Sequence, residues 1–330
     1  MKLSIVILCW NDRSIIKDCL RSIYEGTHLT DFEIIVSDNG SSDGSAEFIR
    51  TNFPDVRVLE NGGNLRFAKG NNVGIRAGNG EYVLILNPDT IVHDGSLDRW
   101  IEFADRHPEA GAFGCRVVNS DGSYQGCARP FPTIWREWLA AFYLRFLGYI
   151  SNLFVTDKYV AWNGTTERII DWQAGCCLLV RGEVVRQLGG FDEQFQYYYE
   201  DLDLCHRIWN AGYTILYTPG SIVTHLGGQS TKNFRPAFEI DKYRNRYRYF
   251  YKYFGSTGVR RCRRVALAWL IIRRLGYGSL QIVNPSEART QRLRLYELAT
   301  TWNRLVDPVE FVEKGREPEV STSVSTQVPQ

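Results

Sequence analysis

The chain has 330 residues, a formal net charge of +2 and 44% hydrophobic residues. This composition excludes a disordered chain and supports a sizeable core, and the balanced charge provides no general attraction to nucleic acid. The eight cysteines include no CxxC pair and no zinc-like spacing. We therefore expect the reduced thiols of a cytoplasmic protein.

The first third of the chain alternates two kinds of segment. Short apolar runs typical of buried strands occupy residues 3–9, 32–37, 56–59 and 82–86. Helical periodicity lies between and after them, near 13–25, 43–53, 67–77 and 96–107. This alternation predicts an α/β fold with a Rossmann-like, mostly parallel central sheet flanked by crossover helices.

The second half has a less regular pattern. Residues 171–180 and 213–217 are predicted strands, the latter ended by Pro219, and 201–211 is a predicted helix closed by Gly212. Residues 138–155 are mostly apolar and predict a buried or interfacial amphipathic helix rather than a membrane span.

A basic region follows. Residues 241–275 contain eleven Lys or Arg and one acid, which suits either bound anionic phosphates, a lipid surface or a solvated helix face. Within it, 265–272 is an apolar run between arginine pairs, which fits a helix on an anionic bilayer or one docked on the rest of the protein. From 313 onward the composition predicts a disordered tail.

Several familiar sites are excluded by their motifs. The chain lacks GxGxxG after its first strand, GxxxxGK[ST] and HExxH. Acids instead follow the predicted strands or open a helix, namely Asp38, Asp43, Asp89, Glu200 and Asp201. Because open α/β sheets bind ligands at the carboxyl ends of their strands, these acids predict a site for a metal-bound phosphate ester.

Five segments, in this order, resemble glycosyltransferase family 2, in particular its rhamnosyltransferase-like bacterial branch: residues 4–11, 36–45, 64–74, 86–89 and 189–204. The resemblance covers roughly residues 3–230 and implies the GT-A fold. It predicts a catalytic domain at 1–235, with a nucleotide-sugar half at about 1–118 and an acceptor half at about 119–235. A basic helical extension would occupy 236–312, before the tail at 313–330.

The resemblance also implies donor-binding residues. Asp38 would accept the imide proton of a pyrimidine, with Asn11 and Asp43 nearby. A helix-capping role is the simpler account of Asp43. The remaining donor-binding candidates are Asn39, Asn64, Arg66, Lys69, Asn71 and Asn87. For Arg66 and Lys69, a solvated helix face is an equal alternative to a contact with diphosphate.

The same resemblance implies which residues bind the metal and which acts as general base. Asp89 would bind Mg²⁺ or Mn²⁺ between diphosphate oxygens, although Asn87 replaces the first acid of the usual motif. His225 would add a second metal contact, unless it is structural. Asp201 would be the general base, with Glu200 orienting the acceptor; complementing a helix dipole is the alternative role of both acids.

Acceptor-binding candidates are Trp172, Gly175 and Tyr199, for which ordinary packing is the alternative. Arg207 is expected to pair with Asp203 four residues earlier. The resemblance as a whole predicts an inverting transferase that moves a sugar, with L-rhamnose a candidate, from a dTDP- or UDP-sugar to a glycan or polyprenyl-linked acceptor. Peripheral contact with the inner face of the cytoplasmic membrane is one interpretation of the basic region. The alternatives are a sugar-phosphate nucleotidyltransferase and a noncatalytic glycan-binding protein.

Overall fold

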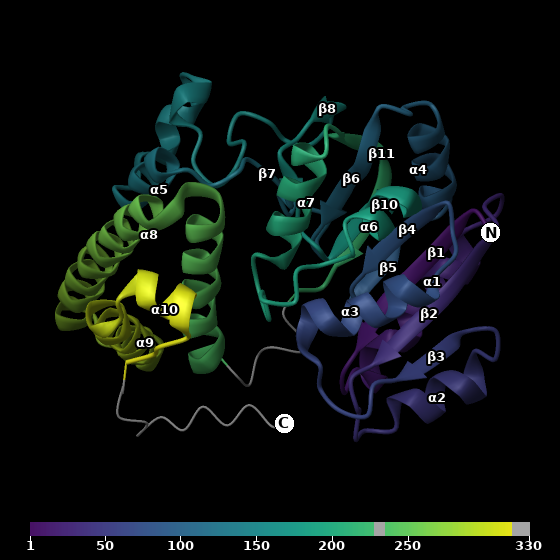
Figure 1. Ribbon diagram of the computed structural model, residues 1–330, viewed down its shortest axis with the longest axis horizontal. Coiled ribbons are helices and arrows are strands. Elements are labelled where there is room, and N and C mark those ends of the chain that lie inside the picture. Colours follow the sequence, from purple (N-terminus) through teal and green to yellow (C-terminus); the bar gives the residue numbers. More distant parts are fainter. Residues whose placement is uncertain (228–234, 319–330) are drawn as a thin grey trace. The chain divides into compact units, whose positions relative to one another are not determined.

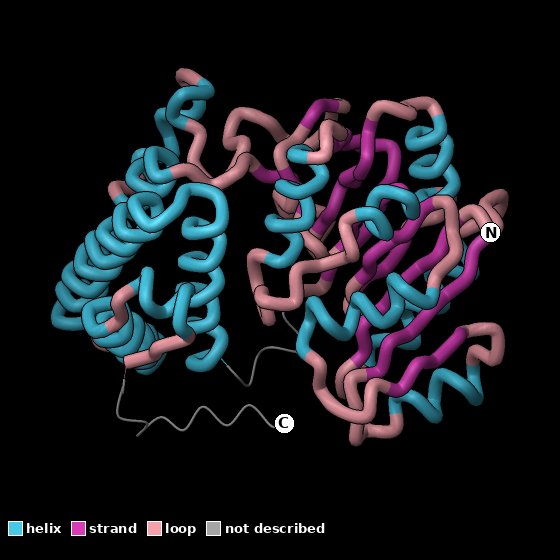
Figure 2. The backbone as a smooth tube through the Cα atoms, in the orientation of Figure 1, coloured by secondary structure: helices cyan, strands magenta, loops and turns pink. Residues whose placement is uncertain are grey.

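The computed structural model describes residues 1–227 and 235–318 (Figure 1). Its contacts divide the chain into two units, Met1–Phe131 with Ala161–Asn233, and Pro132–Val160 with Phe234–Gln330. Figure 2 shows the strands in the first unit, whereas the described part of the second is built of helices and loops. Residues 132–160, assigned above to the acceptor half, thus cluster with the C-terminal helices. The functional boundary at 235 stays a prediction.

The first unit is organised around a nine-stranded sheet of order β3-β2-β1-β4-β10-β6-β11-β5, with β8 paired to β11. Four parallel strands begin it, and β10 then runs antiparallel to both β4 and β6. The strands are β1 (Leu3–Cys9), β2 (Phe32–Asp38), β3 (Arg57–Glu60), β4 (Tyr82–Leu86), β5 (Thr90–Val92), β6 (Ala110–Val118), β8 (Arg168–Ile169), β10 (Cys177–Arg181) and β11 (Thr214–His225). This mixed, mostly parallel sheet confirms the predicted fold class.

Helices flank the sheet, as the alternating pattern predicted (Figure 1). They are α1 (Arg13–Gly26), α2 (Ser45–Asn52), α3 (Arg66–Ala77), α4 (Ser96–Asp105), α6 (Gly182–Gln187) and α7 (Glu200–Asn210). All four strands and four helices expected in the first third of the chain form within two residues of their predicted bounds.

Two predictions in the second half of this unit were wrong. The region 171–180 is not one strand, because β9 (Trp172–Gln173) pairs with β7 (Ala128–Arg129) in a separate small sheet before β10 begins. The strand at 213–217 does not end at Pro219. Its register with β6 shifts between Thr218 and Ile222, so the proline lies in an irregularity that removes it from the ladder.

Strand β1 has a different packing partner on each face. Ile5 and Ile7 belong to the main core with Ile16 and Leu20 of α1. On the other face, α3 approaches closely because it presents glycines. A Cβ on Gly74 would lie 2.4 Å from Val6 Cγ1, and one on Gly70 would lie 2.5 Å from Leu8 Cδ1. This approach sets the position of the loop that precedes α3.

The second unit contains α5 (Ile134–Ala141), the 3₁₀ turns η1 (Leu144–Tyr149) and η2 (Asn152–Phe154), α8 (Arg235–Val283), α9 (Glu287–Leu305) and α10 (Pro308–Lys314). Helix α8 is kinked at Gly255, whose φ is 65°. The single helix expected over 138–155 was wrong, because Tyr143 adopts a left-handed conformation that ends α5. In the described residues, no helix has the length and apolarity needed to cross a bilayer. The predicted tail lies mostly outside the described residues.

The close approach of α3 to β1 gives a test of the fold. Gly74→Ala should lower the free energy of unfolding by about 1–3 kcal/mol, because its methyl group overpacks against Val6. Chemical denaturation measures this, and adding Val6→Ala should recover part of the loss. As a control, Gly276→Ala in α8 meets no atom within 4 Å and should not destabilise the protein. Equal midpoints for Gly74→Ala and the parent would contradict the packing account.

Candidate active site

The register of the parallel strands places their ends at one edge of the sheet. Cys9 of β1 pairs with Asp38 of β2, and Ile7 of β1 pairs with Leu86 of β4. Asp38 and the segment after Leu86 therefore both lie at the carboxyl end of the parallel strands. This is the edge where open α/β sheets bind ligands.

Strand β10 brings the second half of the chain to the same edge. Because it is antiparallel to β4, its first residue, Cys177, pairs with Leu86. Just before it, the Cys176 carbonyl accepts a hydrogen bond of 3.0 Å from Asn87 N–H. Gly175 N–H then donates to Asp201 Oδ2 at 2.8 Å. A continuous chain of contacts thus joins the end of β4 to the start of α7.

Asp38 is buried and organises the loop that follows it. Its Oδ2 accepts from the N–H groups of Gly40 and Ser41 at 3.1 and 2.9 Å, and its Oδ1 accepts from Ser41 Oγ at 2.6 Å. Asn11, with φ of 58°, clamps the next residue, since its Oδ1 accepts from Ser42 N–H at 2.7 Å. A carboxylate has about four acceptor positions, so Asp38 retains room for about one more donor.

Asp43 has structural contacts at the start of α2, although the N-cap residue of that helix is Gly44. It accepts from Arg13 N–H and from Ser45 N–H, both at 3.0 Å, at the start of α2. Burial alone would raise the pKa of Asp43, but these hydrogen bonds and that of the Ser45 hydroxyl outweigh it and lower the pKa. Asp43 therefore links the starts of α1 and α2.

The loop before α3 is held by asparagines. Asn39 Nδ2 donates to Asn64 Oδ1 at 3.3 Å and to the Arg66 carbonyl at 3.2 Å, and Arg66 N–H donates to Asn64 Oδ1 at 2.9 Å. Arg66 adopts a φ of 69°, and its guanidinium lies 5.5 Å from the Tyr197 ring centroid. Asn64 Nδ2 is buried and has no hydrogen-bond partner among the described residues. It is thus a donor available to a ligand.

Two other donor-binding candidates differ in exposure. Asn71 is buried, and its Nδ2 donates to the Phe67 carbonyl at 2.9 Å within α3, which holds the side chain in place. Lys69 is exposed on the first turn of α3. Its ammonium group is therefore available to solvent or to an anion.

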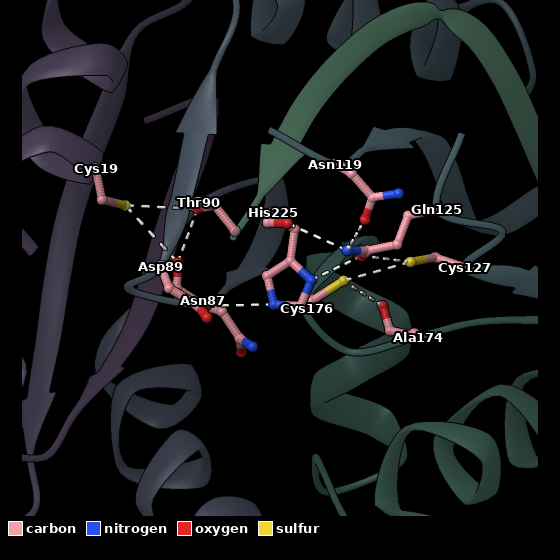
Figure 3. Close-up of polar contacts among 10 residues, drawn as sticks. All are labelled: Cys19, Asn87, Asp89, Thr90, Asn119, Gln125, Cys127, Ala174, Cys176 and His225. Atoms are coloured by element: carbon pink, nitrogen blue, oxygen red, sulfur yellow. Dashed lines mark hydrogen bonds and ion pairs between the residues drawn. The ribbon is translucent and has the colours of Figure 1, made fainter. Parts of the chain in front are cut away.

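Asp89 and His225 lie side by side because β5 pairs with the end of β11, with Thr90 opposite His225. His225 Nε2 lies 3.3 Å from Asp89 Oδ1 (Figure 3). On the other side of the ring, Nδ1 lies 2.8 Å from Gln125 Oε1. Gln125 Nε2 donates to Asn119 Oδ1 and to the His225 carbonyl, which fixes the amide orientation. Nδ1 must therefore donate.

This tautomer directs the remaining ring nitrogen at Asp89. Burial alone would lower the pKa of His225, but the hydrogen bond and charge of Asp89 outweigh burial and raise the pKa. In neutral His225, the Nε2 lone pair faces a carboxylate oxygen, so a proton or another cation is needed between them. One carboxylate and one imidazole suit a divalent ion such as Mn²⁺ that takes its other ligands from diphosphate and water.

The protein donors do not form a complete metal cage by themselves. Within residues 1–227 and 235–318, no group of three or more His, Cys, Asp or Glu is arranged to hold a metal ion. Asp89 and His225 therefore supply only part of the ligand set that a divalent ion needs.

Asp201 opens α7 and is held by backbone. Its Oδ2 accepts from Gly175 N–H at 2.8 Å and its Oδ1 from Leu202 N–H at 2.7 Å. Burial raises the pKa of Asp201, and these hydrogen bonds and the charge of Arg129 offset the rise only in part. A carboxylate that binds a proton more readily than usual is a better general base.

Glu200 is buried beside Asp201, and its carboxylate is less well compensated. Burial and the charge of Asp201 raise the pKa of Glu200 well above its ordinary value, and Oε2 has no hydrogen-bond partner among the described residues. The preceding Tyr198 and Tyr199 both adopt left-handed conformations, with φ of 64° and 71°. Non-glycine residues in this region cost free energy and concentrate at functional sites.

The small sheet β7–β9 adds two further side chains. Trp172 Nε1 donates to the Pro130 carbonyl at 3.0 Å, and the Arg129 guanidinium lies 5.5 Å from the Trp172 ring. Arg129 and Gln125 were not predicted from the sequence, because neither lies in a motif or at the end of a predicted strand. As expected, Arg207 pairs with Asp203, at 2.7 Å.

The raised pKa of Glu200 gives a prediction about how stability depends on pH. Its folded pKa is above its unfolded value, so the folded state binds the proton more tightly, and stability is lost as pH rises from the unfolded pKa through the folded one. Glu200→Gln should therefore raise the denaturation midpoint at pH 8 and have little effect below pH of about 4. An unchanged midpoint at pH 8 would show that burial does not penalise this carboxylate.

Comparison with known proteins supports one family. Residues 4–161 match the model of Glycosyl transferase family 2. The chain is 34% identical over 209 residues to an N-acetylglucosaminyl-diphospho-decaprenol L-rhamnosyltransferase of Mycobacterium tuberculosis, covering 60% of this chain and 67% of that protein. It is 25% identical to Rhamnosyltransferase WbbL of Escherichia coli, covering 66% and 82%.

A solved structure shares the fold. The mannosyltransferase PcManGT from Pyrobaculum calidifontis, in complex with GDP-Man and Mn²⁺, aligns with a TM-score of 0.55 over 92% of this chain and 87% of that one, at 17% sequence identity. This likeness shows a GT-A-type fold and, at this identity, no more. Together with the sequence match, it establishes that the chain is a glycosyltransferase belonging to glycosyl transferase family 2 and resembling its rhamnosyltransferases.

Proposed function

We propose that this chain is an inverting glycosyltransferase that moves a sugar, with L-rhamnose the leading candidate, from a dTDP- or UDP-sugar to a hydroxyl of a lipid-linked oligosaccharide or other bacterial cell-surface glycan. Family membership supports the reaction class. Two relatives are named rhamnosyltransferases, one for a decaprenol-linked diphosphate acceptor, and they support the sugar and acceptor. The observation that carries the proposal is Asp201, held at the end of β4 with a raised pKa.

Asp201 acts as the general base in this proposal. Its carboxylate takes the proton as the acceptor O–H bond breaks, the acceptor oxygen bonds to the sugar carbon, and the nucleotide diphosphate leaves with the electron pair of the broken C–O bond. Gly175 has no side chain, which lets its backbone approach Asp201 closely enough to hold the carboxylate. A Cβ on Gly175 would lie only 3.2 Å from Asp201 Cβ. Glu200 orients the acceptor, and Trp172 and Tyr199 line its path.

The donor lies along the loops after β1, β2 and β3 in this proposal. Asp38 accepts a hydrogen bond from the imide N–H of the pyrimidine ring. Asn11, Asn39 and Asp43 hold the loop in shape. Asn64 Nδ2 donates a hydrogen bond to the nucleotide sugar, which would give this buried amide nitrogen a partner. The remaining donor contacts that we propose are with Arg66, Lys69, Asn71 and Asn87.

Asp89 and His225 would hold a divalent cation, Mg²⁺ or Mn²⁺, brought with the nucleotide. When bound, the cation would stabilise negative charge on the leaving diphosphate. Gln125 holds the His225 ring so that Nε2 faces Asp89. Asp89, His225 and Gln125 would thus determine where the cation and its diphosphate bind. A nucleotidyltransferase or a noncatalytic glycan binder is favoured by no observation at this site.

Asp201→Asn should lower the turnover number by about 10²- to 10⁴-fold, because the amide has the size of the carboxylate but cannot take up a proton. The amide keeps only one of the two acceptor oxygens, so thermal unfolding is measured alongside to confirm that the variant is folded. Donor affinity should stay within about twofold of the parent, since the donor contacts lie elsewhere in this proposal. Turnover is followed with dTDP-rhamnose and a soluble polyprenyl-diphosphate acceptor analogue, and donor affinity by titration calorimetry.

Glu183→Gln is the matched control. Glu183 is an exposed acid in the first turn of α6, so it has the same relation to a helix dipole as Asp201 without the contact to Gly175. Its replacement should leave turnover unchanged. If Asp201→Asn kept ordinary turnover with the same donor and acceptor, the assignment of the base would be wrong.

The metal assignment is tested through Gln125. Gln125→Leu removes the acceptor for Nδ1–H and should weaken Mn²⁺ binding in the presence of dTDP by about 10- to 100-fold. Electron paramagnetic resonance of free Mn²⁺ measures this without turnover. Asp89→Asn should weaken binding at least as much, because it removes the negative charge of the proposed ligand. Unchanged Mn²⁺ affinity in Gln125→Leu would contradict the role of Gln125 in holding the His225 ring for the metal.

A further inference from the structure

The second unit exposes several large apolar side chains within one short segment of the chain. Between the end of α5 and the end of η2, six of them are 52% to 77% exposed. They are Phe142, Tyr143, Phe146, Tyr149, Ile150 and Leu153, and we call this segment, residues 142–153, the aromatic turns. Exposed apolar side chains gathered in this way mark a contact surface.

The segment has a packed inner side, so its outward aromatics are not a sign of a missing core. Ala141, Gly148 and Val155 are buried, and a Cβ on Gly148 would lie 2.7 Å from Val160 Cγ2. Trp135 Nε1 donates to the Leu153 carbonyl at 2.9 Å, which ties the segment to α5. The turns are therefore held in a shape that keeps the aromatic side chains outward.

The segment itself is basic, and the acids that border it in the sequence are Glu137, which pairs with Arg246 at 2.7 Å, and Asp157. In α8, Arg274 lies 3.5 Å from Glu297. Residues 138–156 contain Arg145 and no acid, and residues 256–286, the second half of α8 and the turn after it, contain six arginines and no acid. The two stretches are in contact, because the Arg273 guanidinium lies 4.5 Å from the Tyr143 ring centroid. Figure 1 shows α5 beside α8, and contacts between the two helices agree.

We propose that the aromatic turns are a docking surface for an anionic lipid bilayer. Phenylalanine, tyrosine and isoleucine side chains would enter the headgroup boundary, where aromatic rings are favoured, and arginines would contact lipid phosphates. A protein partner would be expected to present acids to this surface. A second copy of this chain would instead place arginines opposite arginines. Positive charge with an apolar centre therefore fits an anionic bilayer better than self-association.

Cosedimentation with phospholipid vesicles tests the surface. The full chain should bind phosphatidylglycerol-containing vesicles and bind phosphatidylcholine vesicles about tenfold less, with binding that weakens as salt rises. Phe146→Ser with Ile150→Ser should reduce binding to anionic vesicles by at least about tenfold. Arg145→Glu should reduce it as well. Leu29→Ser, at a side chain 89% exposed in the first unit, is the matched control and should bind like the parent.

The same variants distinguish the alternatives. All substituted side chains are exposed, so thermal unfolding should be unchanged and confirms that each variant is folded. If the double variant bound vesicles as well as the parent, or if the parent bound none, the proposal would be overturned. A dimer in sedimentation velocity that the double variant dissolves would instead assign the surface to a second copy. Vesicle binding needs no sugar substrate, so this proposal and the proposed transfer reaction can fail separately.

Discussion

The antiparallel pairing of β10 with β4 is the constraint on which the candidate site depends. It sets Cys177 opposite Leu86, and therefore brings Gly175 and the start of α7 to the carboxyl end of the parallel strands. Without it, the loops after β1, β2 and β4 would present only residues from the first third of the chain at this edge. With it, a buried carboxylate from a distant part of the chain reaches the same edge of the sheet.

Burial and charge then decide what each acid does at that edge. Asp38 and Asp43 accept hydrogen bonds from backbone N–H groups and serine hydroxyls, which suits a rigid loop. Asp201 keeps a raised pKa despite two such bonds, and Glu200 is left with an unpartnered oxygen. Asp89 is paired with an imidazole whose tautomer is fixed by Gln125. Similar side chains thus acquire distinct chemistry from their surroundings.

Much of the fold could be predicted because the first third of the chain follows local rules. Its apolar runs match β1 to β4, and the helical periodicity between and after them matches α1 to α4. The errors arose where tertiary contacts override local signals. Pro219 ends a strand by the usual rule, but a register shift accommodates it within β11. Likewise, Tyr143 gave no sequence signal for the left-handed conformation that ends α5.

The site was predictable to the extent that its residues follow strands or open helices. Gln125 and Arg129 do neither, and their roles depend on pairings across about 100 and 70 residues with His225 and Asp201. The most direct measurement is a crystal structure with Mn²⁺ and dTDP, using the anomalous signal of manganese. Our account predicts the ion between Asp89 Oδ1 and His225 Nε2, with the thymine beside Asp38. Manganese or nucleotide bound away from this edge of the sheet would contradict it.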